Sequence, residues 1–227
     1  MTLAIARRSA GDNFRAGRYD PSGKLWEPDV LVIHVTEGNR GSVRSWFGND
    51  GSDVSAHYMV TTDGTIDQFV DENDTAFHAG EVVNPTAAIV RERRGVNPNV
   101  YTIGIEHEGT GRSELTAKQR AASLELIADI RRRRTKIRAD RRHIIAHHEV
   151  KASKSCPGAI NVDLLVAELQ GAPKRPLVVW SAYLQEWLVV TRVVTDLDWE
   201  FVPLSQVRRG PVTRATVPLS AMPLVQP

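Results

Sequence analysis

Residues 31–36 read LVIHVT, a short run of apolar and β-branched residues that is followed by Gly38 and Gly41. A short apolar run bounded by glycines predicts a buried strand, which here ends at or just after His34. Further strand and helix patterns follow it along the chain. Their alternation predicts an α/β fold with a mixed central β-sheet flanked by helices.

The clearest hairpin signal lies at residues 57–70. The segments HYMVTT (57–62) and TIDQFV (65–70) flank Asp63-Gly64, a dipeptide typical of tight hairpin turns. Two more strands are predicted at residues 101–106 (YTIGIE) and 143–147 (HIIAH).

A long helix is predicted between these last two strands. Thr116 followed by Gln119 has the pattern of a capping box, and an apolar stripe continues through Leu124 and Ile127. The helix ends in four arginines, residues 131–134, whose charge complements the negative end of the helix dipole. Residues 163–170 (DLLVAELQ), followed by Gly171, predict a shorter second helix.

The composition changes after residue 171. Residues 173–176 (PKRP) predict a linker, because two prolines in four residues oppose both helix and central strand. Residues 177–202 contain three of the five tryptophans and β-rich runs around an Asp196-Leu197-Asp198 turn, while residues 208–227 predict an extended tail. We therefore expect a first domain at 1–171 and a small β-containing C-terminal extension at 172–227, which either binds a partner, mediates self-association or packs on the first domain.

Composition excludes several classes of protein. With 41% hydrophobic and 25% charged residues the chain is typical of globular proteins, and its net charge of +2 is too small to indicate a nucleic-acid partner. A single cysteine excludes an intrachain disulfide framework. No apolar run reaches the roughly 18 residues that insertion into a membrane needs, and residues 1–14 lack the apolar region of a secretory signal, so we expect synthesis to end in the cytoplasm. No pattern indicates an oligomeric state.

The strongest chemical signal is HHEVKASKSCPG at residues 147–158. A thiolate at Cys156 and an imidazole at His147 or His148 can share one Zn²⁺ if the loop folds back over the strand end. A catalytic zinc takes three protein ligands, and His34 is the obvious third. Lys154 lies where its charge would lower the thiol pKa or stabilise developing negative charge. The alternative is that these side chains are packed core residues.

Five segments in order resemble the zinc-dependent N-acetylmuramoyl-L-alanine amidase family, which is related to peptidoglycan recognition proteins. The resemblance runs from about Asn13 to about Leu165 and is carried by LVIHVTEG (31–38), VSAHYMVTTDGTIDQFV (54–70), TAFHAG (75–80), YTIGIEHEG (101–109) and HHEVKASKSCPG (147–158).

The resemblance implies a role for several side chains. His34, His147 and Cys156 would bind Zn²⁺, with His147 preferred over His148. Glu106 would act as general base or proton shuttle, the alternative being an ion pair with an arginine, and Lys154 would stabilise the tetrahedral intermediate.

Another branch of that family has a tyrosine immediately before the histidine of the second segment, where this chain has Ala56. The role of that tyrosine therefore does not transfer, and Tyr58 points to a different side of its strand. His78 resembles a cleft residue that touches the glycan or peptide, and the alternative is a half-buried turn histidine.

The implied activity is zinc-dependent hydrolysis of the amide bond between N-acetylmuramic acid and L-alanine in bacterial peptidoglycan. The segment after residue 171 favours a phage-type endolysin that acts on the cell wall after release. The alternatives are a cytosolic amidase that recycles soluble anhydro-muropeptides and a non-catalytic peptidoglycan receptor, whose usual sign is loss of the cysteine ligand.

Overall fold

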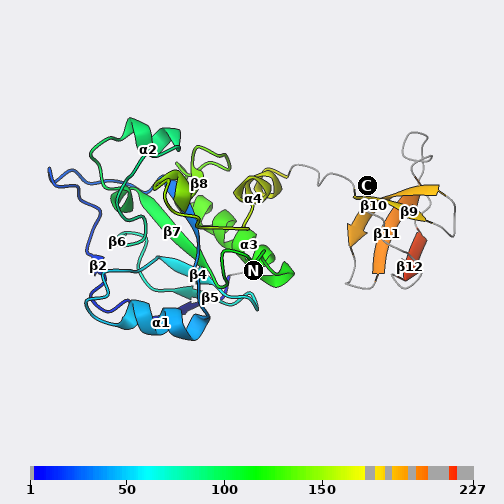
Figure 1. The fold of residues 1–227 in the computed structure, drawn as a ribbon, viewed down its shortest axis with the longest axis horizontal. Helices are drawn as coiled ribbons and strands as arrows, with labels where there is room; N and C mark the ends of the chain where they lie inside the picture. Colours follow the sequence, from blue (N-terminus) through cyan, green and yellow to red (C-terminus); the bar gives the residue numbers. More distant parts are fainter. Residues whose placement is uncertain (1–2, 172–176, 182–185, 194–197, 204–214, 219–227) are drawn as a thin grey trace. The chain divides into compact units, whose positions relative to one another are not determined.

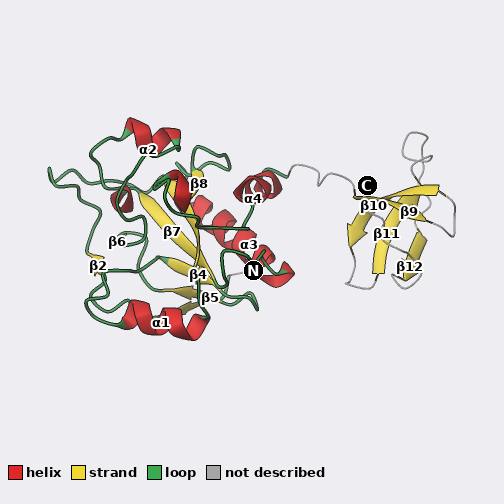
Figure 2. Cartoon of the chain, viewed as in Figure 1, coloured by secondary structure: helices red, strands yellow, loops and turns green. Residues whose placement is uncertain are grey.

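The computed structural model describes residues 3–171, 177–181, 186–193, 198–203 and 215–218. The chain divides into two compact units, Met1–Gly171 and Ala172–Pro227, which are described separately (Figures 1 and 2). Among the described residues, no helix is both long enough and apolar enough to cross a bilayer.

The first unit is built on a six-stranded sheet with the order β1-β5-β4-β7-β3-β8. Only the β4–β5 pair is antiparallel, because a hairpin joins these two strands, whereas the other neighbours run parallel. The strands of this sheet are β1 (Ile5–Arg7), β3 (Val30–Val35), β4 (Tyr58–Val60), β5 (Ile66–Gln68), β7 (Thr102–His107) and β8 (Ile144–Ala146). A separate pair is formed by β2 (Phe14–Arg15) and β6 (Thr75–Ala76).

The helices of this unit are α1 (Arg40–Gly48), α2 (Ala88–Glu92), α3 (Ala117–Arg133) and α4 (Val162–Leu169), with short 3₁₀ helices η1 (Pro98–Val100) and η2 (His147–Glu149). Three of the four α-helices begin at a polar cap. Asn39, Thr116 and Asn161 each accept a hydrogen bond from a backbone N–H of the first turn.

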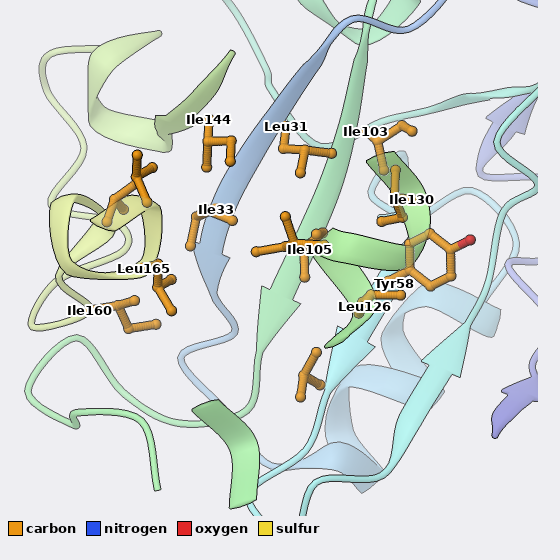
Figure 3. Close-up of a cluster of buried hydrophobic side chains, with 14 of the residues drawn as sticks. Leu31, Ile33, Tyr58, Ile103, Ile105, Leu126, Ile130, Ile144, Ile160 and Leu165 are labelled. Atoms are coloured by element: carbon orange, nitrogen blue, oxygen red, sulfur yellow. The ribbon is translucent and has the colours of Figure 1, made fainter. Parts of the chain in front are cut away.

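Helices cover both faces of the sheet, which explains why β3 is buried throughout and apolar at every position except His34. Leu31 and Ile33 of β3 pack with Ile105 of β7 against α3 and α4, as Figure 3 shows. Val30 and Val32 point to the opposite face and pack in a second cluster with residues of α2. Strand alternation therefore places His34 on this second face, together with Thr102, Gly104 and Glu106 of β7.

The predicted mixed sheet flanked by helices is confirmed, and so are the hairpin and both helices. Two local predictions were wrong. Gln119 does not complete a capping box, because its side-chain amide donates instead to the carbonyl oxygens of Val60 and Glu108, at 2.9 and 3.0 Å. The strand predicted over 143–147 ends at Ala146, and His147 begins η2.

The second unit contains one antiparallel sheet with the order β12-β11-β10-β9. Its strands are β9 (Leu177–Ser181), β10 (Glu186–Val193), β11 (Asp198–Pro203) and β12 (Ala215–Pro218). β12 lies within the segment predicted as an extended tail and pairs with β11. The predicted linker at 173–176 and the turn residues 196–197 lie outside the described residues.

Candidate active site

Two neighbouring parallel strands bring two histidines together. In β3 and β8, Ile33 lies opposite Ala146, so His34, near the end of β3, and His147, the first residue after β8, lie side by side. Their Nδ1 atoms are 3.1 Å apart. Both side chains are buried, and burial lowers the pKa of His147 to about 4 and that of His34 well below its usual value.

Cys156 reaches the same point from the loop after η2. The backbone N–H of His148 donates to the Cys156 carbonyl at 2.9 Å, which folds the loop back over the strand end. The thiol sulfur then lies 3.8 Å from His34 Nδ1 and accepts from the backbone N–H of Val35 at 3.3 Å. Burial raises the pKa of this thiol to about 12, so an added positive charge is needed to hold it as a thiolate near neutral pH.

These three side chains offer one ligand atom each, and all three atoms lie within 4.8 Å of one another. Tetrahedral Zn²⁺ with Zn–N of about 2.05 Å and Zn–S of about 2.3 Å separates its ligand atoms by roughly 3.3 to 3.6 Å. The two distances of 3.1 and 3.8 Å bracket this range. Two imidazoles and one thiol are also a donor set that zinc accepts, so the residues fit that ion.

Glu106 lies directly opposite His34 in the β3–β7 register. Its Oε1 is 4.0 Å from His34 Nδ1, and its Oε2 is buried without a hydrogen-bond partner. No arginine of the described residues pairs with it. Burial raises the pKa of this carboxyl group to about 8. A buried, unpaired carboxyl group beside three metal-type donors is an arrangement suited to proton transfer.

A cavity of about 720 Å³ connects these groups, and its lining includes His34, His78, Glu106, His147, Lys154 and Cys156. Lys154 is an exposed residue of the loop that carries Cys156, and among the described residues no carboxylate pairs with it. Its ammonium charge therefore remains available to a ligand in the cavity.

The remaining candidates separate clearly. His148 is exposed, and its Nδ1 lies 3.1 Å from the Cys156 carbonyl rather than facing the other donors. The Tyr58 hydroxyl donates to Glu72 Oε1 at 2.8 Å in the buried core, so its side chain does not line the cavity. His78 is buried, which contradicts the half-buried alternative, and its Nδ1 lies 3.1 Å from His34 Nε2.

Sequence reasoning missed several buried groups around the site. Thr102 Oγ1 lies 3.1 Å from His78 Nε2, and the Asn99 side chain accepts from the backbone N–H groups of His78 and Ala79. The Ala79 carbonyl in turn lies 3.2 Å from His147 Nε2. The alternation Thr102, Gly104, Glu106 along one strand face was the available signal.

Comparison with known proteins agrees with this geometry. Residues 25–159 match the family described as N-acetylmuramoyl-L-alanine amidase, and this segment contains every candidate site residue. The chain belongs to that family. It is 37% identical over 84 residues to N-acetylmuramoyl-L-alanine amidase A of Achromobacter lyticus, covering 37% of this chain and 38% of that protein.

A second relative of this amidase-family chain is the 1,6-anhydro-N-acetylmuramyl-L-alanine amidase AmpD of Haemophilus influenzae. It is 36% identical over 101 residues, which are 44% of this chain and 50% of the relative. The matches thus span half or less of the length of both relatives. Among solved structures, a selenomethionine derivative of AmpD superposes with a TM-score of 0.58 at 24% identity, covering 74% of this chain and 96% of that one, and this likeness shows the fold.

Proposed function

We propose that this amidase-family chain hydrolyses the amide bond between N-acetylmuramic acid and L-alanine in peptidoglycan, with Zn²⁺ held by His34, His147 and Cys156. The observation that carries the proposal is the convergence of these three donors, all within 4.8 Å of one another, beside the unpaired carboxyl group of Glu106. Retention of the cysteine argues against the non-catalytic receptor.

When bound, Zn²⁺ would supply Lewis acidity and make water nucleophilic at neutral pH by lowering its pKa from about 16 to roughly 7. The two imidazoles, neutral because of burial, and the thiolate would leave the centre with a net charge of +1. Val35 stabilises the thiolate form of Cys156 through its backbone N–H, 3.3 Å from the sulfur.

Glu106 moves the proton in this mechanism. Its unpaired Oε2 accepts a proton from the attacking water and then returns it to the amine that leaves. Burial raises the pKa of this carboxyl group above that of an exposed glutamate, which makes it a better proton acceptor than an ordinary glutamate carboxylate. Lys154, unpaired at the cavity wall, stabilises the negative charge that develops on the carbonyl oxygen.

Two substitutions separate metal binding from proton transfer. Cys156→Ala should lose both zinc and hydrolysis, whereas Glu106→Gln should retain zinc and lose turnover. Metal content is measured on purified protein, and the cleaved bond is located by mass spectrometry of digested peptidoglycan. A Glu106→Gln protein with the wild-type rate would refute the assigned proton role, and zinc-free wild-type protein with full activity would refute the metal role.

The setting we propose is lytic, with the cell wall as the substrate of a phage-type endolysin. Support comes from the second unit, whose own four-stranded sheet is extra to the segment that matches the family. Similarity to the Haemophilus influenzae enzyme supports a second candidate, hydrolysis of soluble anhydro-muropeptides. Turnover on intact sacculi and on soluble anhydro-muropeptides distinguishes them, and a strong preference for the soluble substrate would refute the lytic setting.

Residues 172–227 are proposed to anchor the chain to wall polymer. Removing them should abolish co-sedimentation of the protein with sacculi while leaving the melting temperature of the first unit unchanged. A large fall in melting temperature with unchanged co-sedimentation would show instead that this unit stabilises the first one.

A further inference from the structure

We propose that the dipeptide His78-Ala79 is a positioning element that holds the Nε2–H of both histidine ligands and thereby points both Nδ1 lone pairs at the metal. The expected effect on zinc affinity rests on the proposed zinc site. The hydrogen-bond order itself is a property of the metal-free protein.

Three hydrogen bonds connect the Pro98 carbonyl, through Thr102 and His78, to His34. The carbonyl can only accept, and this fixes which atom donates in each of the other bonds. The Thr102 hydroxyl donates its only proton to the Pro98 carbonyl at 2.8 Å. Its oxygen, 3.1 Å from His78 Nε2, can therefore only accept, so His78 carries its proton on Nε2.

His78 Nδ1 is then the unprotonated nitrogen of a neutral, buried imidazole, and it accepts from His34 Nε2 at 3.1 Å. With its proton held on Nε2, His34 keeps a lone pair on Nδ1. This is the atom that faces His147 and Cys156. The relay thus selects one tautomer of His34 out of two.

The same dipeptide orients the other histidine through its backbone. His147 Nε2 donates to the Ala79 carbonyl at 3.2 Å, which leaves a lone pair on Nδ1 of this ring, 3.1 Å from His34 Nδ1, and two lone pairs at this distance favour a cation between them. The Asn99 side chain fixes the dipeptide by accepting from the N–H groups of His78 and Ala79, at 3.2 and 2.8 Å. The rings of His34 and His147 are therefore both hydrogen-bonded to the same dipeptide, which Asn99 holds in place.

Gly104 provides the space in which the His78 ring lies. A Cβ at this position would be 2.5 Å from His78 Cγ and 2.6 Å from its Nδ1, closer than real contacts allow. The ring therefore packs directly on the backbone of the central strand β7. Since both of its nitrogens already have protein partners, His78 is assigned to positioning rather than to binding substrate.

Thr102→Val tests the relay because it removes the acceptor with little change in shape. In metal-free, ¹⁵N-histidine-labelled wild-type protein, two-bond ¹H–¹⁵N correlation spectra should show His34 protonated on Nε2 and unprotonated on Nδ1. In Thr102→Val, His78 is free to move its proton to Nδ1 and donate to His34, so a population of His34 protonated on Nδ1 should appear. Thr102→Ser keeps the hydroxyl and should restore the wild-type spectrum.

Zinc affinity gives the second readout. Competition with a chromophoric chelator should show Zn²⁺ binding about 10- to 100-fold weaker in Thr102→Val and restored in Thr102→Ser, the usual cost of losing a hydrogen bond that orients a metal ligand. Thr75→Val is the matched control, because it removes a similarly buried hydroxyl whose hydrogen bond goes to the Gly17 carbonyl rather than to a histidine. Its zinc affinity should equal that of the wild type.

A wild-type His34 protonated on Nδ1, or an unchanged His34 tautomer in Thr102→Val, would overturn the proposal. If Thr102→Val does not fold, His78→Phe, which keeps a ring over Gly104 but removes both nitrogens, must change the His34 spectrum and weaken zinc binding, or the proposal is wrong. The tautomer is measured without metal. Failure of the zinc proposal would therefore appear separately, as wild-type protein that binds no Zn²⁺.

Discussion

Gly104→Ala tests the site through a single methyl group on a residue with no chemistry of its own. The added Cβ would lie 2.5, 2.6 and 2.8 Å from three atoms of the His78 ring, whereas ordinary contact begins at 3.4 Å. The ring must therefore move by about 3.4 − 2.5 = 0.9 Å. Gly104 does not have the positive φ that would strain an alanine backbone, so the clash with His78 accounts for the effect.

That movement is enough to break the hydrogen bond to His34. A shift of that size would lengthen the 3.1 Å contact between His78 Nδ1 and His34 Nε2 to at most about 4.0 Å and would also spoil its angle. Loss of this support should weaken Zn²⁺ binding about 10- to 100-fold, equivalent to about 1.4 to 2.8 kcal/mol. Overpacking should also lower the free energy of unfolding by about 1 to 3 kcal/mol.

Chelator competition measures the zinc affinity, and urea unfolding of the metal-free protein measures the stability. Gly48→Ala in α1 is the control, because a Cβ there meets only the Ser9 carbonyl, at an ordinary 3.7 Å. That variant should bind zinc as the wild type does. Zinc affinity within twofold of wild type in Gly104→Ala, with the His34 tautomer unchanged, would refute the reasoning.

Three further predictions address charge and burial. Lys154→Met should lower kcat by about 10²- to 10³-fold with zinc content unchanged, whereas Lys151→Met, which removes the partner of Glu81, should leave kcat near wild type; equal losses in steady-state assays would refute the oxyanion role. Arg18→Met should lower the free energy of unfolding in urea by at least about 3 kcal/mol, because the buried guanidinium donates to four backbone carbonyl oxygens that would lose their partner, and a loss under 1 kcal/mol would contradict this. Burial lowers the pKa of His107 from 6.5 to about 4, so its neutral form contributes stability above pH 6.5 that is lost as the pH falls towards 4, by up to about 3 kcal/mol. Urea unfolding of the metal-free wild type and of His107→Gln should show that the free energy of unfolding falls less in the variant between pH 7.5 and pH 5. Equal falls in the two proteins would refute the role of His107.

The strands could be predicted because their signals are local. β3 is apolar at nearly every position since both of its faces are covered, and the Asp63-Gly64 turn fixes the register of β4 against β5. The failed capping box shows the limit of such signals. The Gln119 amide donates to the carbonyl oxygens of Val60 and Glu108, which lie outside the helix. No pattern within the helix predicts where these acceptors lie.

The candidate site divides in the same way. His34, Cys156 and a histidine at position 147 or 148 could be identified from residue type and spacing, whereas Glu106 was assigned through the resemblance to the family. The choice of His147 over His148 came from the family resemblance, and in the structure the turn of η2 directs the first ring inward and leaves the second exposed.

The support of the site could not be read from the sequence. The roles of Asn99, Thr102 and Gly104 depend on contacts with His78, which comes from a different part of the chain. Glycine in a strand usually weakens it, and here the missing side chain is what admits the ring.

One face of β7 both orients the ligand His34 and positions the proton acceptor Glu106, and the proposed reaction needs these two groups in a fixed relative position. Thr102 ends the hydrogen-bond relay that sets the His34 tautomer, Gly104 seats the ring of that relay, and Glu106 places the proton acceptor 4.0 Å from His34 Nδ1. Because β7 is paired on both sides, with β4 and β3, these three positions move together or not at all. A displacement of the strand would therefore misalign the ligand and the proton acceptor at once, which explains why both are anchored to an interior strand rather than to a loop.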